Sequence, residues 1–254
     1  MSAFFQFFGN GGPPFGPPNQ PIDIVCSEDF TNPQNGVTSS CEGLVNAIGA
    51  PMIASGEVAQ RVAESNIPKR KSGGPSELAN VMTFTLPTRQ TVWTSVDNQV
   101  TVEAVGSTHI GGHASYRVNT PVGSVVIGGD ASDGDDFARG VSTSEEVEAL
   151  AQGADILVHS AIHPVFGPNG GSTYPQPFYA RQSNSEDIGS MADRAGVGAV
   201  LLTHMIPSIG SKTFGIWDVP NGGLSAQKWE KSVQNGGFSG KIVAGEDLET
   251  YRIP

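Results

Sequence analysis

The stretch SVVIGGD, from Ser124 to Asp130, decides the fold. It is a continuous apolar run that ends in two glycines and an aspartate, which is typical of a buried strand covered on both faces. The β-branched runs before it predict strands over residues 81–86, 91–96, 100–105 and 114–120, and TPVGS predicts a hairpin over 120–124. Helical and buried-strand patterns alternate after it, so the sequence predicts an α/β fold.

Predicted helices and short strands fill the rest of the chain. Ser142 with Glu145, and Thr143 with Glu146, form overlapping capping boxes that predict a helix start. Further helices are predicted to begin at Ser185 and over residues 224–234, 41–48 and 57–65. Further strands are predicted over residues 21–26, 156–158, 199–203, 241–244 and 250–253.

Length and charge limit the functional classes. The chain has 254 residues, which suits a single domain over 1–254. The net charge of −11 repels phosphate backbones, so a small-molecule substrate is favoured over nucleic acid. No apolar run reaches about 18 residues, so no membrane span is expected. Cys26 and Cys41 fit either a disulfide or two buried thiols, so they do not indicate the cellular compartment of the protein.

Histidine and aspartate side chains follow four of the predicted strands. His109, Asp130, His159 and His204 each come after a strand that reads as part of the sheet. If those strands share one sheet, their carboxyl ends form a crevice of the kind that binds ligands. Imidazole nitrogen and carboxylate oxygen are common Zn²⁺ ligands, and an aspartate can bridge two ions. The pattern therefore predicts a metal site at this edge.

The segments that carry these residues resemble the C-terminal part of the metallo-β-lactamase-fold hydrolases, in their ribonuclease Z and arylsulfatase-like branch. The resemblance implies an αββα sandwich. It covers about 150 residues, and Pro21–Val25 resembles a strand that follows the family's first metal motif. The matching segments are Thr108-His109 before Tyr116–Val118, Ser124–Asp130, Gly153–His159, Ala199–His204 and Gly240–Leu248.

The resemblance implies a role for each of these side chains. His109 would ligate a first zinc ion, Asp130 would bridge, and His204 would ligate a second ion. His113 is the alternative to His109, because the intervening Gly-Gly makes the loop pliable. His159 would lie just behind the metals. The implied function is a zinc-dependent hydrolase that cleaves an ester, phosphodiester or sulfate ester by metal-bound hydroxide.

The chain departs from the family at two places. The first motif of the family, His-x-His-x-Asp-His, does not occur, so we expect it upstream of residue 1 and expect this chain to be the C-terminal two-thirds of the fold. Gln182 stands where this branch commonly has a histidine. The alternative is therefore that the chain is a catalytically incomplete fragment, or a protein that binds without cleaving, and that it binds zinc weakly or not at all. A fold that lacks its N-terminal part is expected to leave an apolar surface uncovered near residues 1–30 and to self-associate.

Overall fold

The computed structural model describes residues 22–33, 35–56, 59–60, 63, 79–109, 111–134, 140–245 and 250–252. The chain forms two compact units, Met1–Thr85 and Leu86–Pro254. Most of the helix predicted over 57–65, and the first 21 residues, lie outside the described part. The predictions made for them, and that of a single domain, stay predictions.

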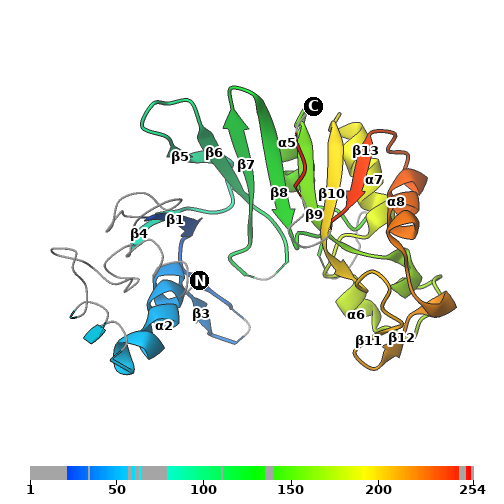
Figure 1. Ribbon diagram of the computed structural model, residues 1–254, viewed down its shortest axis with the longest axis horizontal. Helices are drawn as coiled ribbons and strands as arrows, with labels where there is room; N and C mark the ends of the chain where they lie inside the picture. The colour runs from blue at the N-terminus through cyan, green and yellow to red at the C-terminus, as the bar shows by residue number, and fades with distance from the viewer. Residues whose placement is uncertain are drawn as a thin grey trace. The chain divides into compact units, whose positions relative to one another are not determined.

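A seven-stranded sheet forms the second unit (Figure 1). Its order is β13-β10-β9-β8-β7-β6-β5. The strands are β5 (Gln90–Thr94), β6 (Thr101–Gly106), β7 (Ala114–Thr120), β8 (Gly123–Gly129), β9 (Ile156–Ile162), β10 (Ala199–Ile206) and β13 (Lys241–Ala244).

Strand direction brings five carboxyl ends to one edge of this sheet. Strands β8, β9, β10 and β13 are parallel neighbours, whereas β6, β7 and β8 alternate in direction. Because two reversals restore the direction, β6 runs the same way as β8. The segments that follow β6, β8 and β9, and the end of β10, therefore lie at the same edge.

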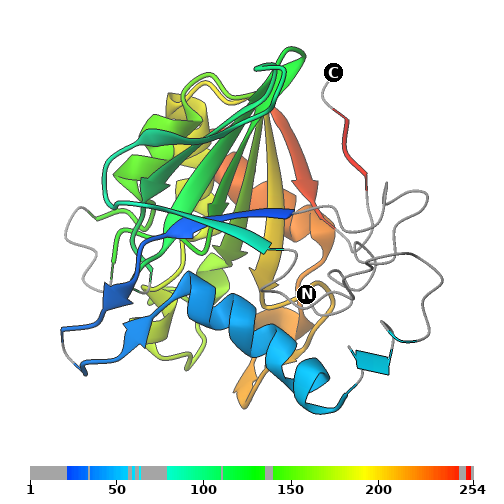
Figure 2. The same cartoon turned by 90° about the vertical axis from the view of Figure 1, so that its left-hand side faces the viewer.

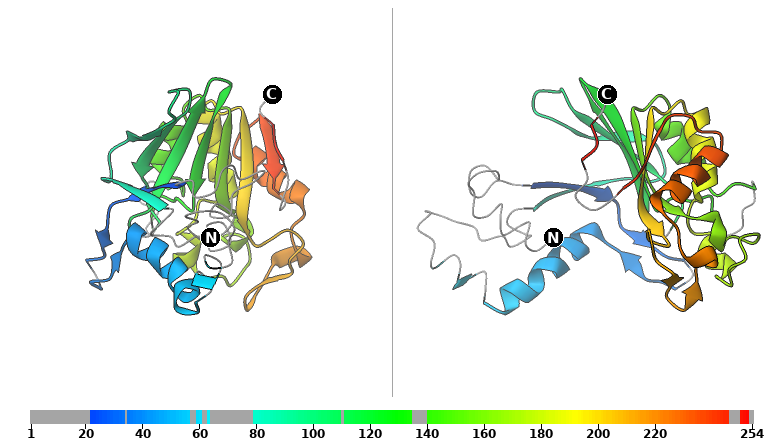
Figure 3. Two further views of the ribbon diagram at one scale, coloured as in Figure 1. Left: turned by 60° about the vertical axis from the view of Figure 1, so that its left-hand side comes forward. Right: turned by 45° about the vertical axis from the view of Figure 1, so that its right-hand side comes forward.

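Three helices cover one face of the sheet (Figure 3). They are α5 (Glu145–Ala151), α7 (Ser185–Arg194) and α8 (Ala226–Asn235). The strand residues beneath them, such as Val126, Leu157 and Val200, are fully buried with Trp229 of α8. This apolar contact is the main stabilising interaction of the unit.

The opposite face carries a row of apolar residues that are only partly buried. Strand pairing aligns them across five strands: Tyr116, Ile127, Val158, Leu201 and Val243. Ile127 is 43% exposed. The prediction that its strand is covered on both faces is therefore wrong, because burial in β8 alternates with the two-residue period of a strand.

The first unit contains a two-stranded parallel sheet and one long helix (Figure 2). Strand β1 (Ile22–Ser27) pairs with β4 (Ala79–Phe84), and helix α2 spans Cys41–Ala54. A disulfide joins Cys26 in β1 to Cys41 at the start of α2. A short hairpin of β2 (Phe30–Thr31) and β3 (Thr38–Ser39) lies between the two cysteines in the sequence.

The predicted helix cap and the last predicted strand are wrong. Ser144 caps α5 by accepting a hydrogen bond from the Val147 amide, whereas both the amide and the hydroxyl of Ser142 donate to the Asp187 carboxylate. Residues 250–252 form no strand.

The structure also contains small elements that the sequence patterns do not predict. They are α6 (Gln176–Tyr179), the β11–β12 hairpin (Thr213–Phe214 and Trp217–Asp218), and short 3-10 turns, Pro164–Phe166 and Pro220–Gly222.

Candidate functional site

Three of the predicted site residues meet at the shared carboxyl edge of the sheet. Asp130 follows β8, and its Oδ2 lies 3.8 Å from Nε2 of His109 and 3.9 Å from Nε2 of His204. His109 comes from the segment after β6, and His204 lies near the end of β10. The sheet topology thus brings together residues that are up to 95 positions apart in the sequence.

A backbone carbonyl fixes the orientation of His109. Its Nδ1 lies 2.9 Å from the carbonyl oxygen of Arg181. A carbonyl can only accept, so Nδ1 carries the proton and donates it. In the neutral ring, Nε2, which faces Asp130, therefore carries no proton. Its lone pair is available to coordinate a metal ion. Metal-binding histidines are commonly oriented in this way by a carbonyl oxygen.

His204 has an unusual backbone conformation. Its φ of 43° lies in the left-handed region, which costs a non-glycine residue roughly 1–2 kcal/mol. The pairing of β10 with β9 is irregular between Thr203 and Ile206, and the His204 side chain is 60% exposed. A bulge of this kind redirects a side chain at the end of a strand. Strain that persists at one residue is typical of functional sites.

Gly128, near the end of β8, makes room for His159. A Cβ on Gly128 would overlap the His159 ring. That ring is fully buried, and its Nδ1 donates to the Ser160 carbonyl oxygen at 2.7 Å. Nε2 of His159 has no hydrogen-bond partner among the described residues. Burial lowers the pKa of His159 to about 4, so the ring is neutral near pH 7.

His113 lies against the same turn. A Cβ on Gly129 would lie 3.1 Å from Nε2 of His113, and the rings of His113 and His109 are 5.5 Å apart. Nδ1 of His113 is 2.8 Å from the Ser107 hydroxyl. Burial, and then the neighbouring His109, lower the pKa of His113 below its ordinary value, which favours the neutral ring.

The fifth histidine, His163, makes a different set of contacts. Its Nδ1 accepts a hydrogen bond from the Val165 amide at 3.1 Å and so caps a 3-10 turn. The ring meets Trp229 edge to face at 5.0 Å. Desolvation by burial is the main cause that lowers its pKa to about 4. His163 therefore supports the loop that begins at Pro164.

The imidazole nitrogens and the carboxylate oxygen suit a zinc ion in type, but they are not close enough together. Two ligands of a tetrahedral zinc ion, each about 2.1 Å from the metal, lie about 3.4 Å apart. The separations of 3.8 Å and 3.9 Å at Asp130 exceed this value. Within the described ranges, no group of three or more His, Cys, Asp or Glu side chains is placed to hold an ion.

The groups that position these side chains could not be recognised from the sequence. Ser160 donates to the carbonyl oxygen of Gly129 at 2.8 Å, and Ser183 donates to that of Ala131 at 2.7 Å. These contacts hold the backbone on both sides of Asp130. Isolated serines carry no sequence signal for such a role. Only Asn184, which accepts a hydrogen bond from the Asp187 amide as the cap of α7, has a recognisable local pattern.

A cavity of about 540 Å³ lies in the same unit. It is lined by Gln176, Pro177 and Tyr179 of α6, and by Asn184 and Asp187 at the start of α7, among other residues. Burial raises the pKa of Tyr179 above its ordinary range, so its hydroxyl stays protonated. The lining therefore combines an aromatic wall with hydrogen-bonding groups.

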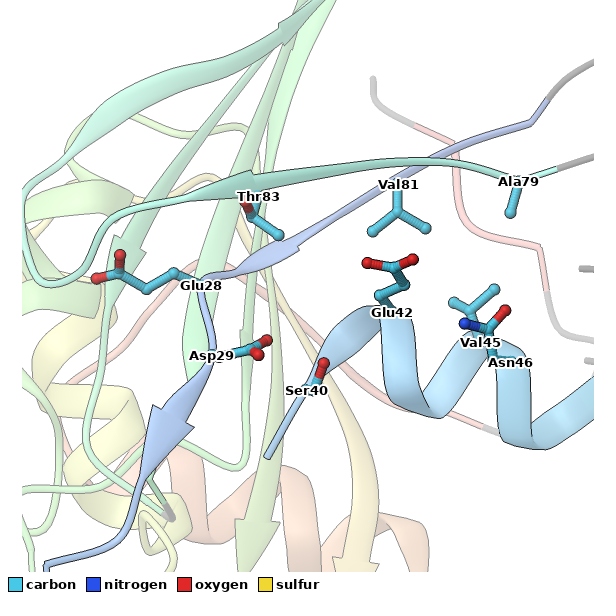
Figure 4. Close-up of a pocket in the computed structure, with 9 residues that line it drawn as sticks. All are labelled: Glu28, Asp29, Ser40, Glu42, Val45, Asn46, Ala79, Val81 and Thr83. Carbon is cyan, nitrogen blue, oxygen red and sulfur yellow. The ribbon is translucent and has the colours of Figure 1, made fainter. Parts of the chain in front are cut away.

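A second cavity, of about 560 Å³, belongs to the first unit. The carboxylates of Glu28, Asp29 and Glu42 line it, and Glu42 of α2 extends toward Val81 of β4 (Figure 4). Its floor includes the buried side chain of Val45. Three carboxylates would repel a phosphate group, so this cavity is unsuited to a phosphodiester.

Comparisons with known proteins relate the chain to one group of enzymes. No protein-family model matches it. Ribonuclease Z of Mycobacterium tuberculosis (strain ATCC 25618 / H37Rv) is 27% identical over 138 residues, which are 54% of this chain and 42% of that protein. Ribonuclease Z of Mycobacterium bovis (strain BCG / Pasteur 1173P2) matches with the same identity and covers 41% of its length. The chain thus spans less than half the length of these relatives.

Two solved structures align with most of this chain. The metallo-β-lactamase fold protein YhfI from Bacillus subtilis aligns with 87% of this chain and 72% of its own, at 15% identity and a TM-score of 0.45. The short form of human tRNase Z aligns with 91% of this chain and 79% of its own, at 12% identity and a TM-score of 0.43.

No helix of the described residues is long and apolar enough to cross a bilayer.

The sequence match and the mixed α/β architecture agree with the motifs. The likeness to the arylsulfatases stays a prediction. The α/β fold class is confirmed, and the chain resembles the ribonuclease Z branch of the metallo-β-lactamase-fold hydrolases, as its sequence motifs predict.

Proposed function

We propose that this chain provides part of the active site of a metal-dependent phosphodiesterase, with His109, Asp130 and His204 as metal ligands. The observation that carries this proposal is the position of the Asp130 carboxylate, within 4 Å of two imidazole Nε2 atoms from separate segments of the chain. Carboxylate and imidazole ligands converging at the carboxyl edge of a sheet suit a hydrolytic metal centre.

Zinc is the metal that these donors favour, with two ions in a complete site. Asp130 has two carboxylate oxygens and would serve both ions, while His109 and His204 would each serve one. When bound, such a cation would polarise a phosphoryl oxygen and increase the acidity of a nearby water molecule. The Arg181 carbonyl would keep His109 in the tautomer that leaves Nε2 free to coordinate.

The phosphodiester is the ester class with the most support. Both curated relatives described above are named ribonuclease Z, which implies cleavage of RNA by those proteins. The net charge of −11 weakens non-specific attraction to nucleic acid, but it does not determine the chemistry of a local site. A small-molecule ester is therefore a second substrate class, and the sulfate ester has no added support.

The second candidate is a chain that does not cleave a substrate by itself. It is favoured by the separation of the ligand atoms, because no described group of three donors is placed to hold an ion. A metal content well below one equivalent in the purified chain, together with absent hydrolysis, would support this candidate.

The test compares zinc content and hydrolysis in matched variants. We expect wild type to retain zinc and to hydrolyse bis(p-nitrophenyl) phosphate faster than p-nitrophenyl sulfate. Asp130→Ala should lower zinc affinity ~100-fold or more, since this residue alone could contact both ions. The control is Asp97→Ala, which removes an exposed carboxylate from a turn between β5 and β6.

A second pair of variants tests the location of the site. His204→Ala should lose zinc and activity, whereas His163→Ala should retain zinc, because His163 caps a 3-10 turn elsewhere. Unchanged zinc in Asp130→Ala, or greater zinc loss in His163→Ala than in His204→Ala, would show that the site is wrongly assigned.

A further inference from the structure

The cavity beside α6 is lined by two side chains whose orientations are fixed by hydrogen bonds. Its volume of about 540 Å³ lies in the range of small-molecule sites. The two side chains are Gln176, at the start of α6, and Asp187, in the first turn of α7. The hydrogen bonds that they already make show which of their atoms remain for a ligand.

One oxygen of the Asp187 carboxylate is fully engaged by the protein. Its Oδ2 accepts from the amide and the hydroxyl of Ser142 and from Nδ2 of Asn184, each at 2.7 Å. Within the part of the chain that the structure describes, no donor contacts Oδ1. Three short bonds thus hold the carboxylate in place and leave Oδ1 for a ligand.

Gln176 is oriented by two backbone carbonyl groups. Its Nε2 lies 3.2 Å from the Phe166 carbonyl oxygen and 3.3 Å from that of Tyr174. A carbonyl oxygen can only accept, so these contacts distinguish the amide nitrogen from the amide oxygen and use both Nε2 hydrogens. Oε1 of Gln176 therefore remains as a second acceptor, with no donor to it in the described ranges.

The described lining suits a cation with an apolar body. Asp187 is the only Asp, Glu, Lys or Arg among these lining residues, so they carry a negative charge. Asn184 does not offset that charge for a ligand, because its Nδ2 already donates to Asp187. The ring of Tyr179 and the side chains of Pro168 and Pro177 supply apolar surface. The net charge of −11 also attracts cations to the molecule.

We propose that this cavity binds a small organic amine in its protonated form. The ammonium group donates to Oδ1 of Asp187, and Oε1 of Gln176 is a further acceptor. An ammonium group has donors and no acceptor, which matches the oxygens that the protein leaves unused. A phosphate or carboxylate ligand would be repelled by Asp187. The site needs no metal ion and is independent of the function proposed at Asp130.

Benzylamine is the probe, because it combines an ammonium group with a small apolar ring. It is titrated at pH 7 into the full chain while nitrogen-15 NMR follows the backbone amides. We expect saturable shifts that centre on Ala180, Asn184 and Asp187, which line the cavity. Benzyl alcohol has the same ring without the charge, so it should bind about 10-fold more weakly or worse.

Asp187→Asn tests the carboxylate with little change of shape. The amide oxygen can still accept from Ser142, whereas the amide nitrogen takes the place of Oδ1, so benzylamine affinity should fall about 10-fold or more. Gln176→Ala removes the second acceptor and should weaken binding about 3-fold or more. The matched control is Asp193→Asn, an exposed position of the same helix, which should stay within about 2-fold of wild type.

A peptide distinguishes the two sources of an ammonium group. Acetyl-Gly-Lys-Gly-amide presents a lysine side chain on a polypeptide, and it should bind more weakly than benzylamine, because its flexible chain must be ordered. Tighter binding of the peptide would assign the cavity to a lysine of a partner protein and would overturn the proposal of a small amine.

Three further results would overturn the proposal. They are no saturable binding of benzylamine in the millimolar range, equal affinity for benzylamine and benzyl alcohol, and wild-type affinity in Asp187→Asn. Circular dichroism checks that each variant is folded, and if Asp187→Asn does not fold, wild-type affinity in Gln176→Ala is the contradicting result. Zinc content and hydrolysis at Asp130 are measured separately, so either proposal can fail alone.

Discussion

At the scale of single residues, hydrogen bonds to the backbone determine what each histidine can do. His109 and His159 donate from Nδ1 to carbonyl oxygens, and His163 accepts at Nδ1 from an amide. The first arrangement leaves Nε2 as a donor atom for a metal, whereas the second leaves it protonated. Chemically identical side chains are thus assigned to different roles by the backbone group that they meet.

The low pKa of His163 predicts a pH-dependent stability. Above pH 6.5 the ring is neutral in both the folded and the unfolded chain and adds no pH dependence. As the pH falls from 6.5 to about 4, the unfolded ring gains a proton that the folded ring does not bind. The free energy of unfolding should therefore fall across this range, by ~1–2 kcal/mol after allowance for partial exposure.

Urea unfolding of wild type and His163→Gln, measured between pH 7.5 and 4.5, tests this prediction. The variant should lose part of the decline in stability, because glutamine does not titrate. His159 is present in both chains, so its own titration cancels in the comparison. Parallel stability curves for the two chains would contradict the prediction.

The sequence predicted which residues gather at the site because they follow strands. His109, Asp130 and His204 could be placed on one edge once a sheet was expected. The groups that orient them could not be predicted, since Arg181 contributes a carbonyl oxygen that every residue possesses. Such contacts depend on the path of a loop, which no local pattern specifies.

At the scale of elements, close contact between α7 and α8 depends on glycine. A Cβ on Gly189 of α7 would overlap the carbonyl group of Val233 in α8, and a Cβ on Gly236 would overlap that of Glu186. The Ser190 hydroxyl donates to the Gly236 carbonyl oxygen at 2.7 Å across the same contact. The two helices therefore pack with backbone against backbone.

Gly189→Ala should separate these helices. The obstacle is a backbone carbonyl that cannot rotate away, so we expect the free energy of unfolding to fall by about 2–3 kcal/mol. Asp193→Ala, on the exposed side of α7, should change it by less than ~0.5 kcal/mol. Thermal or urea unfolding measures both, and equal stabilities of the two variants would contradict the packing argument.

The regular elements were predictable from the sequence, whereas their ends and the small elements were not. Strands β4 to β10 and helices α5, α7 and α8 follow hydrophobic patterns that the sequence shows plainly. The cap of α5 was assigned wrongly because Ser142 binds Asp187, a residue 45 positions away. A contact over that separation overrides a local capping pattern.

At the scale of the whole molecule, the two units are stabilised by different means. The second unit has a large apolar core, which includes Leu150, Leu157 and Trp229. The hydrophobic cluster described in the first unit contains one buried residue, Val45. The partly buried side chains of Ile24, Ala79 and Val81 pack against it. A small core of this kind gains more from a covalent link.

Reduction of the Cys26–Cys41 disulfide should therefore destabilise the first unit selectively. The bond closes a loop of 15 residues, and such a loop is worth ~3 kcal/mol on chain-entropy grounds. Hydrogen exchange should accelerate in β1, β4 and α2 on reduction and stay unchanged in β9 and β10. The Cys26→Ser variant should behave like the reduced chain, and acceleration spread evenly over both units would contradict the prediction.

The left-handed backbone at His204 has a consequence for protein engineering. Glycine adopts φ of 43° without steric cost, so a library selected only for heat resistance would enrich glycine at this position. The variants selected in this way would tolerate higher temperatures and would lack an imidazole that the proposed reaction needs. Directed evolution of this chain should therefore screen for turnover from the first round.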